Sequence, residues 1–275
     1  MDGAAGLNQA TLTALIALVR KHTGIAMSER KSILLERRLR PRMQALALHD
    51  YREYVEKVEQ DREEVPHFID LVTTNDTLFF RTPHIWAYLE QEFLPGWWSS
   101  HAGKRLDIWS AAASSGEELY SLAMLCEEFR LRQPSFRYRI LGTDISRQIL
   151  EVARNGCYAG RSMERLRETH PDWLDKYFQS APDGCMQVRE LLQKNVELRS
   201  HNLLQPLRPQ QQFDLVLLRN VLIYFDAPHQ QTVLQQARLS MAPHAVMVIG
   251  ESESISSLNT AYHLDRPMIY HMEAA

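Results

Sequence analysis

Apolar side chains in the first third of the chain recur at three- and four-residue spacing, as they do on one face of an α-helix. Leu12, Leu15 and Val19 define a first helix that ends at Gly24, and Ser28 begins a second one. Pro41 lies inside the second pattern, so we expect a kink or a restart there. Two shorter helices are predicted over residues 51–59 and 65–71. The pattern predicts an all-helical N-terminal domain with its linker over residues 1–87.

From Arg105 onward, apolar runs alternate with amphipathic segments. Three of these runs are near-continuously apolar, which is typical of strands that are buried on both faces of a parallel sheet. The runs cover residues 106–113, 138–143, 196–200, 213–218 and 245–250, and the helical segments cover 117–130, 146–155 and 229–241. This alternation predicts a doubly wound α/β domain over residues 88–275.

The alternation of apolar runs and helical segments stops between Gly156 and Asn195. This stretch is too long for a simple helical crossover. The segment Ala181-Pro-Asp-Gly184 is a turn signal with apolar pairs on both sides. We therefore predict a small inserted β-subdomain over residues 156–195 that contains a hairpin.

Composition excludes little. Net charge is −3, so no global charge points to nucleic acid. No apolar run is long enough to cross a membrane and the N-terminus has no signal-peptide pattern, so we expect a cytoplasmic protein. The cysteines Cys126, Cys157 and Cys185 are odd in number and form no CxxC pair. We expect reduced thiols, no disulfide framework and no metal site.

Ligands of open parallel sheets bind beyond the carboxyl ends of the strands, so the turns there are the first place to look for a site. The turn Trp109–Gly116 consists mostly of small residues and is followed by Glu117 and Glu118. Small side chains allow a ligand to approach the backbone, but two glutamates would repel a dinucleotide's pyrophosphate. A cationic ligand such as a sulfonium fits better. The alternative is that both glutamates only complement the helix dipole.

Polar side chains also follow the next three apolar runs. Asp144 lies where an acid holds ribose hydroxyls in nucleotide-binding α/β domains, although it could equally be a helix N-cap. Asn202 can bind an adenine edge through both ends of its amide, or it can be an ordinary loop asparagine. Arg219 and Asn220 place further polar groups where the sheet opens.

The segments WSAAASSGEELYSLA, LGTDIS, NLL and LLRNVLIYFD, with TTNDTLFFR upstream of them, resemble in this order the CheR family of chemotaxis receptor methyltransferases. The resemblance extends from about residue 12 to about residue 270. It implies a class I, Rossmann-like methyltransferase that transfers the methyl group of S-adenosylmethionine to receptor glutamates. The positions that it implies for the cofactor are Asn75, Thr77, Arg81, Glu117, Asp144, Asn202, Leu203, Arg219 and Asn220.

The same resemblance places Arg81 and Tyr224 nearest the reacting atoms. A glutamate carboxylate is already ionised near neutral pH, so its attack on a methyl group needs no strong general base. The enzyme would instead have to position the carboxylate and remove water from it. Arg81 can orient one carboxylate oxygen, and Tyr224 can donate to it or pack beside the sulfonium. Judged on their own, Arg81 would be a linker salt bridge and Tyr224 a core aromatic.

The second helix is basic. A solvated face or a nucleic-acid surface are the alternatives, but the chain is acidic overall and the segment lacks interleaved aromatics. The resemblance implies that this helix docks on acidic receptor helices, although Pro41 departs from the family's helix. The candidate receptor-binding residues are Arg30, Lys31, Arg37, Arg38 and Arg42. The expected partner is the cytoplasmic domain of chemotaxis receptors, bound by a monomer, with neither nucleic acid nor membrane insertion involved.

Two other functions stay open at this point. A nucleic-acid methyltransferase of the same fold would carry an Asn-Pro-Pro-aromatic segment where this chain has Arg219 to Tyr224. A catalytically silent adaptor that binds S-adenosylmethionine is disfavoured by the presence of Arg81 and Tyr224. In family members that bind a receptor's C-terminal peptide, the inserted subdomain binds it by strand addition. The loop between Phe178 and Val188 looks shorter here, so we expect no dependence on such a tether.

Overall fold

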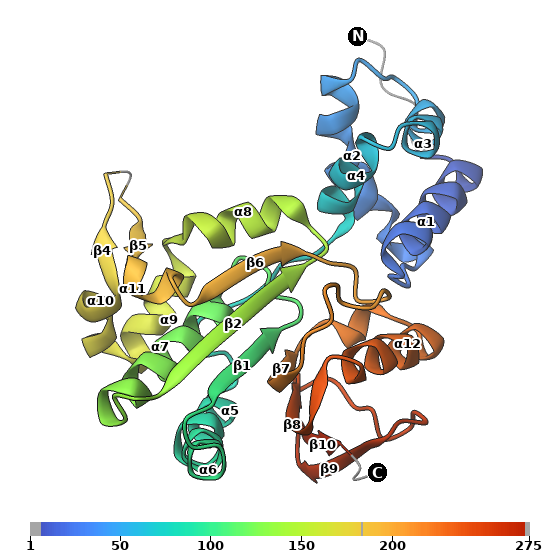
Figure 1. The fold of residues 1–275 in the computed structure, drawn as a ribbon. Helices are drawn as coiled ribbons and strands as arrows, with labels where there is room; N and C mark the ends of the chain where they lie inside the picture. The colour runs from blue at the N-terminus through green and yellow to red at the C-terminus, as the bar shows by residue number, and fades with distance from the viewer. Residues whose placement is uncertain (1–6, 183, 273–275) are drawn as a thin grey trace.

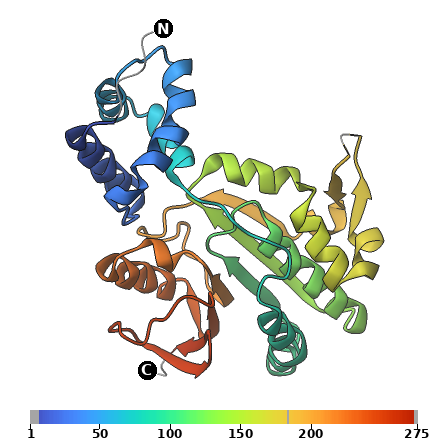
Figure 2. The same cartoon turned by 180° about the vertical axis from the view of Figure 1, so that it is seen from behind.

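The computed structural model describes residues 7–182 and 184–272, and its N-terminal part is a separate lobe of helices (Figures 1 and 2). Leu15, Leu35 and Phe68 are fully buried in the core of this lobe. Its elements are α1 (Gln9–Thr23), the 3₁₀ turn η1 (Glu29–Lys31), α2 (Ser32–Ala45), α3 (Tyr51–Gln60) and α4 (Glu64–Val72). The prediction of an all-helical N-terminal domain is confirmed.

Gly24 ends α1 in the left-handed conformation, with φ at 76°, and its N–H donates to the carbonyl oxygen of Arg20 at 2.8 Å. A Cβ atom at this position would lie 2.5 Å from the Leu204 side chain. Glycine is therefore needed twice, for its backbone conformation and for the close approach of α1 to the second domain.

Pro41 does not restart α2, which runs unbroken from Ser32 to Ala45. The prediction of a restart is wrong. Proline deprives the carbonyl of Arg37 of its helical donor, but both residues are exposed and water can take that place. Leu39 and Met43 are buried on either side of Pro41, so packing keeps the helix continuous.

The second domain contains a seven-stranded sheet in the order β6-β2-β1-β7-β8-β10-β9. The first five strands in this order are parallel, while β10 runs antiparallel to β8 and β9 antiparallel to β10. The strands are β1 (Arg105–Ser110), β2 (Arg137–Asp144), β6 (Val196–Ser200), β7 (Phe213–Leu218), β8 (Met241–Ile249), β9 (Tyr262–Arg266) and β10 (Ile269–Met272). The predicted doubly wound α/β fold is confirmed, and strand order reverses between β1 and β7.

Helices cover both faces of this sheet. Alternate side chains of β1 enter two apolar clusters, Ile108 on one face and Trp109 on the other. The helices are α5 (Pro83–Tyr88), the π-helical turn η2 (Leu89–Phe93), α6 (Leu94–Ser100), α7 (Glu117–Arg132), α8 (Arg147–Asn155), the 3₁₀ turn η3 (Leu222–Tyr224) and α12 (Ala227–Arg238). Phe79 and Ile85 pack against the sheet, although the sequence placed residues up to 87 with the helical lobe. The last helix was predicted over residues 229–241, but α12 ends at Arg238 because Met241 already begins β8.

The predicted insert is a subdomain of its own that projects away from the helical lobe (Figures 1 and 2). Its three strands form an antiparallel sheet in the order β3-β5-β4. The elements are β3 (Cys157–Tyr158), α9 (Arg161–Thr169), α10 (Pro171–Tyr177), β4 (Phe178–Ser180), β5 (Met186–Val188) and α11 (Glu190–Gln193). The hairpin β4–β5 confirms that prediction; Asp183 of the predicted turn lies outside the described residues.

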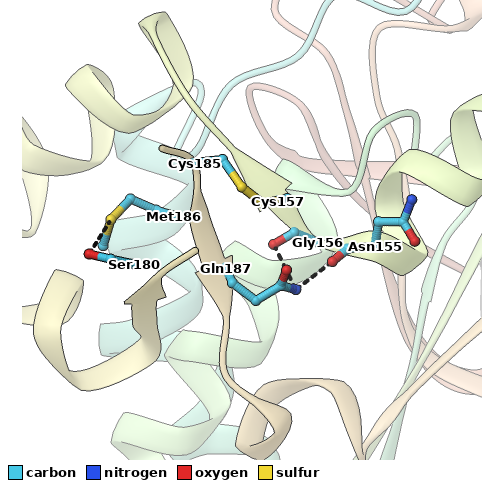
Figure 3. Close-up of a disulfide and its surroundings, with 7 residues drawn as sticks. All are labelled: Asn155, Gly156, Cys157, Ser180, Cys185, Met186 and Gln187. Carbon is cyan, nitrogen blue, oxygen red and sulfur yellow. Dashed lines mark hydrogen bonds between the residues drawn. A yellow bond between two sulfur atoms is a disulfide. The ribbon is translucent and has the colours of Figure 1, made fainter. Parts of the chain in front are cut away.

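A disulfide joins Cys157 on β3 to Cys185, the residue just before β5, with their Cα atoms 5.7 Å apart (Figure 3). The Gln187 side chain on β5 donates to the carbonyl oxygens of Asn155 and Gly156. The expectation of reduced thiols is therefore wrong for these two cysteines, whereas Cys126 is free and buried. Spacing along the chain gave no sign of the pair, because the β3–β5 pairing is what brings the two residues together.

No helix among the described residues is both long enough and apolar enough to span a lipid bilayer.

Candidate active site

A pocket gathers nearly all of the predicted site residues. It lies where the carboxyl ends of β1, β2 and β7 meet the linker after α4, and Thr23 and Ile25 of the helical lobe complete its wall. The predicted residues that line it are Asn75, Thr77, Arg81, Asp144, Asn202, Leu203, Arg219, Asn220 and Tyr224. The pocket therefore lies at the carboxyl ends of the strands, where we expected a ligand to bind. Of the residues predicted for the cofactor, only Glu117 does not line it.

Glu118, rather than Glu117, faces the pocket. Gly116 begins α7 with φ at 96°, and the first turn of the helix directs the two carboxylates differently. The hydroxyls of Ser115 and Ser162 donate to the Glu117 carboxylate at 2.5 and 2.8 Å, and its burial raises its pKa. Of the two adjacent glutamates, Glu118 is therefore the one that lines the pocket.

Glu118 forms a buried ion pair with Arg219. The Arg219 Nη1 atom donates to Glu118 Oε2 at 2.8 Å, and the Ser110 hydroxyl donates to Oε1 at 2.9 Å. Burial raises the pKa of Glu118, and the positive charge of Arg219 opposes that rise. Arg219 also donates to the carbonyl oxygen of Arg81 at 2.9 Å, so β7 is tied to the linker.

Asp144 closes the turn after β1. Its carboxylate accepts the backbone N–H groups of Ser114 and Ser146, each at 3.0 Å. Burial raises the pKa of Asp144, while these two N–H groups act to lower it. The alternative that Asp144 is the N-cap of α8 is wrong, because Ser146 caps that helix by accepting from the N–H of Ile149.

Both ends of the Asn202 amide are engaged. Its oxygen accepts the N–H of Leu204 at 3.0 Å, and its nitrogen donates to the carbonyl oxygen of His22 at 3.1 Å. Asn202 therefore holds its own loop against α1 while it lines the pocket. Next to it, burial lowers the pKa of His201 to about 4, so this imidazole is neutral near pH 7.

Arg81 lies on a strained turn of the linker. Phe80 and Thr82 both adopt left-handed backbone conformations, with φ at 50° and 68°. The indole N–H of Trp86 donates to the Arg81 carbonyl oxygen at 2.8 Å and helps to fix the turn. The Arg81 guanidinium donates to the carbonyl oxygen of Asp76 at 3.1 Å and forms no ion pair within residues 7–182 and 184–272. The alternative, that Arg81 only forms a salt bridge within the linker, is therefore wrong.

Tyr224 lines the pocket from the end of η3, where it is half-buried. The backbone N–H of Ala26 donates to its carbonyl oxygen at 2.8 Å, and Ile25 forms an antiparallel bridge with Phe225. Arg20 of α1 adds an ion pair with Asp226. The helical lobe thus contacts the loop that carries Tyr224, and this tyrosine is a pocket residue rather than a core aromatic.

The basic helix α2 divides into two sets of residues. Arg38 donates to the carbonyl oxygens of Val72 and Thr73 at 3.1 and 2.8 Å and to the Thr74 hydroxyl at 3.1 Å. Arg42 forms a two-point ion pair with the buried carboxylate of Glu64, with distances of 3.0 and 2.7 Å. Both guanidinium groups are directed inward, which is not what the sequence led us to expect. The exposed cations are Arg30, Lys31, Arg37 and Arg40.

Three buried polar atoms of residues that line the pocket have no protein partner among the described residues. They are the Ser114 hydroxyl oxygen, the Arg219 Nε atom and the His201 Nε2 atom. Buried polar groups normally have partners, so these three atoms are candidates to bind a ligand. Ser114 was missed from the sequence, where it is one of several small residues in a turn; its left-handed φ of 51° was not visible there.

The pocket suits a cationic nucleoside more than a phosphorylated one. Glu118 and Asp144 supply two buried carboxylates, and Ser114 and Arg219 supply unpartnered donors for a ligand's own carboxylate. S-adenosylmethionine carries a sulfonium, an ammonium, a ribose and a carboxylate, so its groups match these side chains. Among the described residues, no cluster of histidine, cysteine or acidic side chains is arranged to hold a metal ion.

Comparison with known proteins identifies the family of the chain. Residues 75–267 match the family model described as CheR methyltransferase, SAM binding domain, and residues 10–73 match CheR methyltransferase, all-alpha domain. Chemotaxis protein methyltransferase 1 of Pseudomonas aeruginosa is 34% identical over 248 residues, which are 89% of this chain and 90% of that protein. The chemotaxis protein methyltransferase of Salmonella typhimurium is 32% identical over 273 residues, 96% of this chain and 90% of that one.

Proposed function

The chain belongs to the CheR methyltransferase family, and from that premise we propose that it methylates glutamate side chains of chemotaxis receptors, with S-adenosylmethionine as the methyl donor. The observation that carries the proposal is the composition of the pocket. Buried carboxylates lie on the sheet side, and Arg81 and Tyr224 border the pocket from the linker and from η3. This arrangement offers a place for a cationic cofactor and another for an anionic substrate.

For the cofactor, we assign Asp144 to the ribose hydroxyls, and Glu118 with Ser114 and Arg219 to the amino-acid portion. Leu203 and the neighbouring Asn202 would flank the adenine, and Asn75 and Thr77 would close the site from the linker. Glu117 then acts indirectly, by fixing the turn through Ser115 and Ser162. When bound, the cofactor supplies an electrophilic methyl group on sulfur.

The protein's part in the reaction is to position and desolvate a glutamate carboxylate. That carboxylate is ionised near neutral pH, so the reaction needs no general base. Arg81 would hold one carboxylate oxygen through its fork of donors, which leaves the other oxygen free to attack. Tyr224 would donate to the same carboxylate or pack beside the sulfonium.

A change of charge explains why a shielded pocket helps. The carboxylate anion and the sulfonium cation react to give a neutral methyl ester and a neutral thioether. Water stabilises the separated charges more than it stabilises the transition state, in which they are partly neutralised. The wall that the helical lobe adds through Thr23 and Ile25 would keep water from this step.

We propose that the exposed cations of η1 and α2 contact the receptor. Arg30, Lys31 and Arg37 are exposed on the lobe that borders the pocket, and the cytoplasmic helices of receptors would present acidic side chains to them. Arg38 and Arg42 would act behind this surface. In this proposal the enzyme works in the cytoplasm as a monomer, does not insert into membrane and does not bind nucleic acid.

We further propose that methylation does not depend on a C-terminal receptor peptide. The edge strands of the insert are β3 and β4, which have two and three residues, so they offer few backbone groups to an added strand.

The test is to incubate the whole chain with methyl-labelled S-adenosylmethionine and a purified receptor cytoplasmic domain. A glutamate ester releases labelled methanol in mild base, whereas methylated amines and nucleobases do not. Base-labile label on the receptor is the expected result. Base-stable label would indicate a different methyltransferase, and cofactor binding without any transfer would indicate a silent adaptor.

A further inference from the structure

The carboxylate of Glu253, in the loop after β8, accepts four backbone N–H groups. Oε1 accepts from Val221 at 2.8 Å and from Leu222 at 2.7 Å. Oε2 accepts from Asn220 at 2.9 Å and from Gly250 at 2.5 Å. Three of these donors are consecutive residues that lie more than thirty positions earlier in the chain. One side chain thus holds the whole start of the loop that follows β7.

That loop carries pocket residues. Asn220 lines the pocket in a left-handed conformation, with φ at 57°, and Tyr224 lines it at the other end of the loop. Between them, the N–H groups of Asn220, Val221 and Leu222 point to Glu253 rather than into a helix. Glu253 does not itself line the pocket, so any effect on the reaction must pass through the loop.

Gly250 makes this close approach possible. A Cβ atom at this position would lie 2.8 Å from the backbone nitrogen of Asn220, from its side-chain nitrogen and from Glu253 Oε2. The N–H of Glu253 donates to the carbonyl oxygen of Gly250 at 3.1 Å, and this turn brings the carboxylate back to the loop. Gly250 and Glu253 act as one unit that joins the end of β8 to the loop after β7.

The donors require a carboxylate. An ionised carboxylate only accepts hydrogen bonds and has lone pairs for about four of them. A glutamine has the same shape, but its NH₂ group would face two of the backbone N–H donors. Because both groups are donors, they would repel each other and two hydrogen bonds would be lost. A negative charge also strengthens each bond relative to a neutral acceptor.

We propose that Glu253 is a positioning residue for methyl transfer, which holds the Asn220–Tyr224 loop so that both side chains border the pocket together. The inference rests on the proposed function, because it assigns Glu253 a role in that reaction. It goes beyond it by adding a residue that contacts neither cofactor nor substrate.

The test compares Glu253→Gln and Glu253→Asp with Glu251→Gln, an exposed carboxylate two residues away. Transfer to the receptor is measured per bound S-adenosylhomocysteine, so that only folded protein is counted. Amide hydrogen exchange of the peptide that spans residues 219–225 is measured on the same samples. Exchange reports on the loop even if the receptor is not a substrate.

We expect Glu253→Gln to lower kcat roughly ten- to hundred-fold, which corresponds to the loss of charge-assisted hydrogen bonds. Exchange in residues 219–225 should accelerate in this variant. Glu253→Asp should recover part of the lost kcat and part of the protection from exchange. Glu251→Gln should change neither kcat nor exchange. Unchanged kcat and exchange in Glu253→Gln would overturn the proposal, as would a Glu253→Asp variant no better than Glu253→Gln. If the wild-type protein binds S-adenosylhomocysteine but transfers no methyl group, the proposed function fails. Unaltered hydrogen exchange in Glu253→Gln would still refute the role of Glu253 in the loop.

Discussion

The backbone N–H of Ala26 donates to the carbonyl oxygen of Tyr224 at 2.8 Å. Through this bond the helical lobe, which carries the basic helix, directly contacts the loop that borders the pocket. The lobe is therefore part of the active-site wall and more than a docking module attached by a linker. Arg38 makes a second connection of this kind, because it binds the linker at Val72, Thr73 and Thr74.

Arg38→Ala should weaken cofactor binding. The linker just after Thr74 carries Asn75 and Thr77, and three hydrogen bonds from Arg38 hold it in place. Loss of charged hydrogen bonds typically costs about 1.5–3 kcal/mol, and we expect the lower end because the guanidinium is partly exposed. Calorimetry with S-adenosylhomocysteine measures the change.

Arg37→Ala is the matched control on the same helix. Its side chain is exposed, so cofactor affinity should stay as in wild type while KM for the receptor rises. That rise should shrink with added salt, because exposed charges are screened within about 10 Å at 0.1 M. If both variants affect only receptor KM, then Arg38 belongs to the docking face and its contacts to the linker are incidental.

Asp144→Ala should weaken binding of both S-adenosylmethionine and its product. The carboxylate lies at the end of β2 and also holds Ser114 in the turn after β1. The expected loss is about 1.5–3 kcal/mol, the usual contribution of hydrogen bonds to a charged group. Asp172→Ala, at an exposed position in α10, provides the comparison in the same titration. Equal affinities for both variants would remove Asp144 from the cofactor site.

Arg81→Ala should reduce kcat more than cofactor affinity. The guanidinium has no acidic partner within the described residues and borders the pocket, so a substrate carboxylate is its natural counterion. Tyr224→Phe should cause a smaller loss because the ring stays in place. Single-turnover rates with saturating cofactor separate the two effects. A fall in cofactor affinity with kcat intact would assign Arg81 to the cofactor alone.

Glu64 should make the stability of the helical lobe depend on pH. Burial alone would raise the pKa of Glu64, but the hydrogen bonds from Arg42 and Tyr54 outweigh burial and lower it below its usual 4.5. A depressed pKa stabilises the folded state above the unfolded value and loses that contribution as pH falls through the folded value. Glu64→Gln should therefore cost about 2 kcal/mol near pH 7, less than a fully buried pair because Arg42 is 28% exposed.

Urea unfolding at several pH values measures this cost. The difference between wild type and Glu64→Gln should be constant above about pH 5 and should narrow as the pH falls below 4.5. A difference that does not change with pH would mean that packing, rather than ionisation, sets the effect.

The strand-end rule made most of the pocket predictable. Asp144 ends β2, Asn202 follows β6 and Arg219 follows β7. Because these strands run parallel in one sheet, their carboxyl ends lie along the same edge. The choice between Glu117 and Glu118 was not predictable. Adjacent residues of a helix point about 100° apart, and only the packing of α7 decides which one faces the pocket.

In α2 and in the insert, too, packing decides features that the local sequence does not predict. Arg37 and Arg38 are adjacent and identical in kind, yet one is exposed and the other holds the linker. Their difference depends on how α2 packs against the end of α4, which no local pattern reveals. Cys157 and Cys185 meet because β3 pairs with β5, a contact between segments 28 residues apart.

The most direct test of glutamate methylation is to map the methyl group by mass spectrometry. The receptor cytoplasmic domain is incubated with the whole chain and S-adenosylmethionine, digested, and its peptides are sequenced before and after mild base. We predict the added mass of a methyl group on glutamate side chains, lost after base treatment, and its near absence when the enzyme carries Arg81→Ala. Methyl groups on lysine or arginine, or an unmodified receptor beside an enzyme that binds the cofactor, would contradict the proposed function.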